Sequence, residues 1–258
     1  MAMSTEQFSL AGRTAVVTGC NAGLGRAMAL ALAEAGADIV GLNRSAADEL
    51  AGRVGQLGRR FLDVRADLGD GSTAAALIEQ AASLTGRIDI LVNNAGIIRR
   101  QAAIDFSEQD WDEVMDLNLR TVFMLSQAAA QRFVEQGEAP CRGKIINIAS
   151  MLSFQGGVRV PSYTASKSGV LGLTRALANE WAAQHINVNA IAPGYMDTSN
   201  TAPLRADEDR NNAILKRIPA ERWGAPEELA GPVVFLASSA SDYMHGHALA
   251  VDGGWLAR

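Results

Sequence analysis

Short apolar runs alternate along the chain with longer Ala- and Leu-rich segments of helical period, from residue 13 to the C-terminus. The short runs are rich in β-branched residues, and several are apolar at consecutive positions, which is typical of strands buried on both faces. We therefore predict an α/β fold, a Rossmann-like, doubly wound, seven-stranded parallel sheet with helices on both faces. The predicted strands cover residues 14–18, 38–42, 60–66, 88–93, 144–150, 186–192 and 247–251.

The alternation continues without a Pro-, Gly- or Ser-rich linker, so residues 1–258 are predicted to form a single domain. The segment 200–222 departs from the pattern, because it is polar, contains the charged run RADEDR and has Pro203 and Pro219 near its ends. Long connections of this kind are commonly either functional or irregular. Two interpretations stay open: a mobile substrate lid over a pocket, or an ordinary solvated helical insertion.

Composition narrows the choice of partners. Lys and Arg number 23 against 28 Asp and Glu, a formal charge of −5, which argues against a nucleic-acid partner. No stretch without a charged residue, such as 145–158 or 181–196, is long enough to span a bilayer, and MAMSTEQFSL lacks the features of a secretory signal. We expect no membrane partner and a cytoplasmic location. The three histidines, Cys20 and Cys141 lack the spacing of a metal site, so no metal is expected and both cysteines are interpreted as free thiols.

A glycine-rich turn joins the first predicted strand to the helix that follows. It reads TGCNAGLG and contains Gly19, Gly23 and Gly25, with Asn21 and Leu24 between them. Glycine permits the positive φ of a tight turn and a close approach of the backbone to a phosphate, and a helix N-terminus offers free N–H groups. The strand before it and the helix after it favour a dinucleotide site over a plain strand-to-helix turn.

The end of the second predicted strand bears on the form of this dinucleotide. An acidic residue there bonds the ribose hydroxyls of NAD, whereas an arginine accommodates the 2′-phosphate of NADP. This chain has Asn43 and Arg44 at the corresponding place. A guanidinium can bind a phosphate by charge-assisted hydrogen bonds, or it can face solvent. The residues alone leave the choice between NAD and NADP open.

A second cluster of polar residues lies in the middle of the chain. Tyr163 and Lys167 are four positions apart, which places them on one face of a helix. A tyrosine with a pKa of about 10 is a poor proton-transfer group at neutral pH, and a nearby ammonium favours its phenolate. Ser150 closes the fifth predicted strand, where it can hold a substrate oxygen while Tyr163 gives or takes a proton. The Tyr-Lys spacing is common by chance, but here it accompanies a nucleotide loop and polar residues at other strand ends, which predicts carbonyl/alcohol interconversion.

These motifs resemble the short-chain dehydrogenase/reductase family over essentially the whole chain from Leu10. The resemblance rests on TGCNAGLG at 18–25, NNAG at 93–96, LNLRTV, YTASK at 163–167 and PGYMDT at 193–198. It implies an NAD(P)-dependent oxidoreductase in which Tyr163 is the general acid/base and Lys167 lowers its pKa and binds the nicotinamide ribose. It further implies that Ser150 orients the substrate and that Asn118 supports a water-linked proton relay to Lys167. The cofactor residues that it implies are Gly19, Asn21, Gly23, Leu24, Gly25, Arg44, Asp67, Leu68, Asn94, Ala95, Gly96, Tyr163, Lys167, Pro193, Gly194, Met196 and Thr198.

Longer blocks, including NNAGIIRR, VPSYTASKSGV and RIPAERWG, resemble a narrower group of the family that acts on keto and hydroxy sugar acids in the breakdown of pectin and related uronate polymers. This implies a sugar-acid substrate, NAD as the usual cofactor and a homotetramer, although Arg44 leaves NADP open. An acid substrate needs a cation, and we predict that Arg100 and Arg159 bind its carboxylate. Two alternatives remain: a reductase of another polyol or ketone, such as 5-ketogluconate, and a catalytically silent nucleotide-binding sensor.

Overall fold

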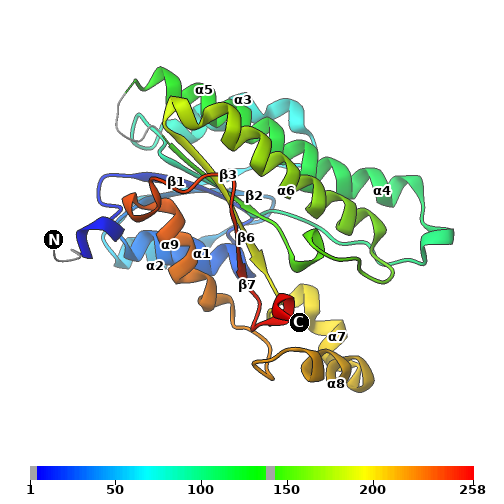
Figure 1. Cartoon of the computed structure of the whole chain (residues 1–258). Coiled ribbons are helices and arrows are strands. Elements are labelled where there is room, and N and C mark those ends of the chain that lie inside the picture. The colour runs from blue at the N-terminus through cyan, green and yellow to red at the C-terminus, as the bar shows by residue number, and fades with distance from the viewer. Residues whose placement is uncertain (1–4, 138–142) are drawn as a thin grey trace.

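The computed structural model describes residues 5–137 and 143–258, and Cys141 lies outside these ranges. Seven strands form one parallel sheet in the order β3-β2-β1-β4-β5-β6-β7 (Figure 1). The strand order reverses between β1 and β4, as in a doubly wound sheet. The predicted fold class is therefore confirmed. The strands are β1 (Thr14–Thr18), β2 (Asp38–Asn43), β3 (Phe61–Arg65), β4 (Ile90–Asn93), β5 (Gly143–Ile148), β6 (Ile186–Pro193) and β7 (Ala248–Val251).

Helices cover both faces of this sheet (Figure 1). Side chains of consecutive strand residues point to opposite faces, so Val17 packs with α1, α2 and α9 while Val16 packs with α3, α5 and α6. Two apolar layers result, one on each face, which explains why the strands are apolar at consecutive positions. The helices are α1 (Gly23–Glu34), α2 (Asp48–Gln56), α3 (Ala74–Ala82), α4 (Glu108–Met115), α5 (Thr121–Glu135), α6 (Pro161–Trp181), α7 (Ala202–Ala206), α8 (Glu208–Arg217) and α9 (Ala230–Ala237).

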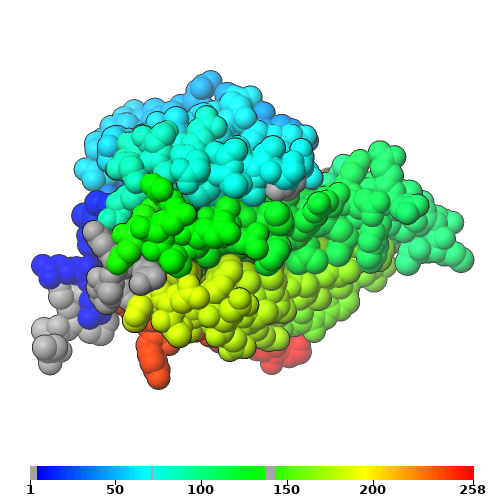
Figure 2. All heavy atoms as spheres, turned by 90° about the horizontal axis from the view of Figure 1, so that it is seen from above, coloured from blue at the N-terminus to red at the C-terminus, as the bar shows by residue number. Residues whose placement is uncertain are grey.

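The two views place the helices relative to the strand ends. Figure 2 looks onto one covered face, where α3, α5 and α6 form adjacent cyan, green and yellow bands. The short helices α7 and α8 lie outside both layers, beyond the carboxyl ends of β6 and β7 (Figure 1). The start of this segment is tied to the loop after β6, because Arg205 forms an ion pair of 2.6 Å with Asp197. Residues 200–222 thus stand at the edge of the sheet where ligands of such folds bind.

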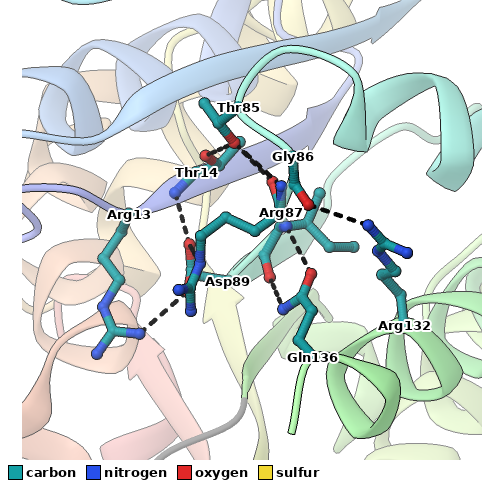
Figure 3. A network of polar contacts seen from close by, with 9 residues as sticks. Arg13, Thr14, Thr85, Gly86, Arg87, Asp89, Arg132 and Gln136 are labelled. Atoms are coloured by element: carbon teal, nitrogen blue, oxygen red, sulfur yellow. Dashed lines mark hydrogen bonds and ion pairs between the residues drawn. The ribbon is translucent and has the colours of Figure 1, made fainter. Parts of the chain in front are cut away.

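A polar network occupies the opposite, amino-terminal edge of the sheet (Figure 3). Its centre is Asp89, which directly precedes β4 and is 2% exposed. The carboxylate accepts hydrogen bonds from the backbone N–H of Thr14 at 2.9 Å, from Arg13 at 3.0 Å and from Arg87 at 2.6 Å. A buried carboxylate is tolerated only when it is paired in this way. The network therefore joins the beginnings of β1 and β4, the two strands at the switch point.

In the described part of the chain, no helix is long and apolar enough to cross a membrane. The same residues contain no group of three or more His, Cys, Asp or Glu side chains arranged to hold a metal ion. Cys20 is buried as a free thiol.

Asp89→Ala is expected to lower the free energy of unfolding by about 1–3 kcal/mol, because the N–H of Thr14 and two arginines lose their acceptor. Urea unfolding followed by circular dichroism measures this loss. Glu79→Ala is the control, since Glu79 meets Arg132 at 3.9 Å with its side chain 64% exposed, and such a pair contributes at most about 1 kcal/mol. Equal losses in the two variants would contradict the role given to the Asp89 network.

Candidate active site

The glycine-rich turn between β1 and α1 leaves the first helical turn open to an anion. Gly19 and Gly23 have φ of 63° and 53°, and a Cβ at Gly25 would collide with the carbonyl of Gly19. The N-cap residue of α1 is Ala22, and no side chain caps this helix. Its N–H groups and its dipole therefore favour a phosphate here.

A groove of about 460 Å³ extends from this turn to α6. Three predicted cofactor residues, Pro193, Gly194 and Met196, do not line this groove. Pro193 is the last residue of β6, and Gly194 lines a neighbouring cavity. The side chain of Met196 turns the other way and packs against Gly224. The structure thus brings neither Pro193 nor Met196 to the groove. The predicted residues that do line it are Gly19, Asn21, Gly23, Leu24, Gly25, Arg44, Asp67, Leu68, Asn94, Ala95, Gly96, Tyr163, Lys167 and Thr198.

The end of β2 presents a cation and a hydroxyl to the groove. Asn43 is 1% exposed, and its amide accepts from the N–H of Cys20 at 2.8 Å and donates to Asp63 at 2.8 Å. Its polar atoms are therefore committed to the protein. Arg44 and Ser45 are exposed and line the groove. The corner thus offers an exposed guanidinium beside a hydroxyl, a combination suited to a phosphate.

The loop after β4 is fixed by two asparagines. Asn94 donates to the carbonyls of Thr18 and Gly19, which ties this loop to the glycine-rich turn. Asn118 is fully buried in a π-helical turn, Asp116–Arg120, between α4 and α5. It accepts from the N–H of Ile97 and donates to its carbonyl, both at 2.9 Å. These contacts hold the floor of the groove in place.

Tyr163 and Lys167 lie on one face of α6, as their spacing predicts. The Nζ of Lys167 is 5.7 Å from the centroid of the Tyr163 ring. Lys167 is 4% exposed and donates to the carbonyl of Ile148, at the end of β5, over 2.6 Å. Ser150 follows β5, accepts a hydrogen bond from the N–H of Leu152 and bonds the phenol of Tyr163. The end of β5 thereby sets the positions of all three side chains.

Burial shifts both titratable groups toward their neutral forms. Desolvation raises the pKa of Tyr163, while the hydrogen bond from Ser150 and the positive charge of Arg100 lower it. Desolvation lowers the pKa of Lys167 to about 8. The groups that favour the phenolate in this structure are thus Ser150 and Arg100, and Arg100 was expected only to bind substrate.

A second cavity, of about 750 Å³, adjoins the groove and shares Tyr163 and Asn200 with it. Ser150, Arg100 and Arg159 line this cavity, as a substrate site would require. The phenol of Tyr163 therefore stands where the two spaces meet.

Segment 200–222 supplies residues that sequence reasoning did not include. Arg210 and Arg217 of α8 line the second cavity together with Leu204 and Ile214. The two arginines are seven positions apart, which is about two helical turns, so the spacing alone places them on one face. Nothing in the sequence indicated which face of α8 would point toward Tyr163.

Comparison with known proteins identifies the family. Residues 19–256 match the model for enoyl-(acyl carrier protein) reductase, a short-chain dehydrogenase model. The chain is also 62% identical, over 99% of its length and 100% of the relative's, to 2-dehydro-3-deoxy-D-gluconate 5-dehydrogenase of Dickeya dadantii (strain 3937). The chain belongs to the short-chain dehydrogenase family.

Solved structures of related short-chain dehydrogenases have the same fold. One is a putative 2-deoxy-D-gluconate 3-dehydrogenase from Agrobacterium tumefaciens with bound NADP, at TM-score 0.91 and 54% identity over 98% of this chain and 100% of that one. Another is a putative NAD(P)-dependent gluconate 5-dehydrogenase from Beutenbergia cavernae with NADP at low occupancy, at TM-score 0.92 and 51% identity over 98% and 100%.

A nicotinamide dinucleotide, the cofactor of short-chain dehydrogenases, fits the groove described above. The uncapped N-terminus of α1 would hold its phosphates at one end. Toward α6, Gly96 keeps the floor clear, because a Cβ there would lie 3.1 Å from Asn118 and 3.8 Å from the Nζ of Lys167.

Titration of Lys167 is expected to make stability rise with pH in the alkaline range. Burial lowers its pKa to about 8 from the ordinary lysine value of 10.5. Between these two values the unfolded chain binds more protons than the folded protein, so the unfolding free energy rises with pH, by at most about 1.4 kcal/mol per unit. Urea unfolding of the cofactor-free protein at about pH 7.5 and about pH 9.5 measures the change. Lys167→Met should lack this increment, and an identical pH dependence in both proteins would contradict the assignment.

Proposed function

We propose that this short-chain dehydrogenase transfers a hydride between a nicotinamide cofactor and a keto or hydroxy sugar acid. The favoured pair is 2-dehydro-3-deoxy-D-gluconate and 3-deoxy-D-glycero-2,5-hexodiulosonate, and the Dickeya dadantii relative is named for the first of these compounds. The observation that carries the proposal is the position of Tyr163, which lines both the dinucleotide groove and the arginine-rich cavity beside it. A phenol at that junction can exchange a proton with a substrate oxygen.

The chain's own residues provide the proton transfer. In reduction Tyr163 gives its proton to the carbonyl oxygen, and in oxidation it takes the proton of the alcohol. Ser150 holds the same oxygen, since its hydroxyl already bonds the phenol. The family resemblance adds Lys167, which when protonated would stabilise the phenolate and would hold the cofactor ribose. The bound nicotinamide accepts or supplies the hydride.

Asn118 has an indirect part in this proposal. Both of its polar groups bind Ile97, and Lys167 donates to Ile148. In the proposed relay, a water molecule would carry protons between Lys167 and solvent. Asn118 would support this relay indirectly, by holding Ile97 at the wall of the groove that Lys167 also lines.

The charge of the cavity supports an acidic substrate. Arg100 and Arg159 line it, and a guanidinium binds a carboxylate in a bidentate manner. An alternative is gluconate 5-dehydrogenase activity, the description of the Beutenbergia cavernae structure. Its substrate is also a sugar acid, so the arginines do not separate the two.

The cofactor corner favours acceptance of NADP beside NAD. Arg44 and Ser45 line the groove at the end of β2, and Asn21 donates to the Ser45 hydroxyl at 2.8 Å. A 2′-phosphate placed there would meet the guanidinium of Arg44. It would meet no repelling carboxylate at positions 43 and 44, because these residues are Asn43 and Arg44. NADP in the Agrobacterium tumefaciens structure agrees with this preference.

Further parts of the proposal rest on the family resemblance and on the position of α7 and α8. The first part is that the enzyme is a cytoplasmic homotetramer that acts in the breakdown of uronate polymers. The second part is that residues 200–222 form a lid over the cavity, which α8 lines.

Steady-state kinetics with the two cofactors and a panel of keto sugar acids tests the activity. We expect a higher kcat/KM for the 2,5-diketo acid than for 5-ketogluconate. Tyr163→Phe should lower kcat by roughly 100- to 10,000-fold with both cofactors, because it removes the transferable proton. Binding of NADPH, measured by fluorescence, should stay unchanged in this variant.

A clear preference for 5-ketogluconate would replace the narrower assignment by the gluconate alternative. Full activity of Tyr163→Phe would remove the proton-transfer role. Cofactor binding without turnover of any keto sugar acid would favour a nucleotide-binding sensor.

Arg44→Ala is expected to raise the KM for NADPH by roughly 10-fold and to leave the KM for NADH unchanged, because a single charge-assisted contact to the 2′-phosphate is lost. Arg53→Ala is the matched control, since Arg53 is exposed on α2 and does not line the groove. An unchanged KM for NADPH in Arg44→Ala would reject the phosphate contact.

A further inference from the structure

The cavity next to Tyr163 carries a strong excess of positive charge. Four arginines line it, against a single carboxylate from Asp207; they are Arg100, Arg159, Arg210 and Arg217. The chain as a whole is acidic, with a formal charge of −5. So concentrated a set of guanidinium groups favours an anion inside the cavity and attracts one toward it.

Two of these arginines are held by the protein. Arg100 donates to the carbonyl of Asn200 at 3.0 Å. Arg217 donates to Gln155 at 3.0 Å and lies over the ring of Trp255, 4.0 Å from its centroid. Each of these contacts fixes the direction of a guanidinium that forms part of the wall.

Arg210 differs from them. Its backbone N–H binds the carboxylate of Asp207, the N-cap of α8, at 3.1 Å. Among residues 5–137 and 143–258, its guanidinium has no hydrogen-bond or ion-pair partner, and the same is true of Arg159, on the loop before α6. Both side chains are exposed at the cavity. They are the two arginines of the wall with all their donors available.

The charge of Arg210 also reaches the interior of the cavity. Burial raises the pKa of Tyr195, and the charges of Arg210, Arg217 and Arg100 lower it. Tyr195 lines the same cavity and packs edge-on against Trp255, 4.9 Å between centroids. The charges of three guanidinium groups thus act on one phenol, and among the described residues only that of Arg210 lacks a hydrogen-bond or ion-pair partner.

We infer that Arg210 is a specificity-determining residue that binds the carboxylate of the substrate, together with Arg159 from a separate segment of the cavity wall. This inference rests on the proposed function and adds to it a residue of the 200–222 segment. A carboxylate has two oxygens, so it can accept from both guanidinium groups at once. Such a bridge would join α8 to the loop before α6, both of which line the cavity that contains Tyr163.

Helix α8, which carries Arg210 to the cavity, is anchored at one end. The far end of α8 is fixed, because Arg258 donates to the carbonyls of Lys216 and Arg217, both at 2.9 Å. The near end carries Arg210, three residues after the N-cap. An acidic substrate therefore meets the guanidinium of Arg210 on an anchored helix, whereas an uncharged ketose has no carboxylate to bind it.

The test compares Arg210→Gln with Lys216→Gln, a change of the same charge on the same helix at a side chain outside the cavity. The substrates are 5-keto-D-gluconate and 5-keto-D-fructose, which has no carboxylate. Arg210→Gln should lower kcat/KM for the acid by roughly 10- to 100-fold, mainly through KM, and change that for the uncharged ketose less than about 3-fold. Lys216→Gln should leave both values unchanged. Arg210→Lys should recover part of the loss, since it restores charge without the bidentate fork.

Equal losses for both substrates, or no loss for the acid, would overturn the inference while leaving the proposed oxidoreductase activity intact. If the unmodified protein reduces no keto sugar acid, the proposed function fails. The role of Arg210 is then tested separately, by measuring how tightly a sugar acid binds. D-gluconate is then titrated calorimetrically into the NADPH complex. Weaker binding in Arg210→Gln than in Lys216→Gln supports the carboxylate site, and equal or absent binding refutes it.

Discussion

Because helices bury the sheet on both faces, polar side chains on the strands need partners inside the protein, and most functional polar groups gather where the strands end. Polar residues within the sheet fit this constraint, since they find partners inside the protein: Asn93 donates to Asn147, and Asn147 donates to Thr174 of α6. All strands are parallel, so their carboxyl ends meet at one edge. Burial alone therefore assembles the groove, the second cavity and Tyr163 at a common place.

The two edges of the sheet use charge differently. At the amino-terminal edge a buried carboxylate, Asp89, is matched by two arginines and a backbone N–H. At the carboxyl edge cations are left without matching carboxylates, among them Lys167, whose buried ammonium has only a carbonyl partner. The first arrangement stabilises the fold. The second leaves positive charge available to the phosphates, phenolate and carboxylate that the proposed reaction brings there.

The site also illustrates how a pKa depends on more than one neighbour. The four-residue spacing of Tyr163 and Lys167 correctly places both on one face of α6. Yet the groups that lower the tyrosine pKa in the structure are Ser150, from the end of β5, and Arg100, from the loop after β4. Proton transfer at this phenol is therefore a property of three separate chain segments and of their packing, in addition to the helix that carries it.

The sequence by itself determined the sheet, the glycine-rich turn and the side of α6 that carries Tyr163 and Lys167, because strand and helix periods and the φ freedom of glycine are local properties. Most of the predicted cofactor residues also line the groove, since many of them follow a strand. Only the tertiary structure decided that Asn43 is buried against Asp63 while Arg44 faces the groove. It likewise turned Met196 toward Gly224 and directed Arg210 and Arg217 into the cavity. Those outcomes depend on how distant segments dock on one another, and the spacing of residues within a segment carries no information about the surface that it will meet.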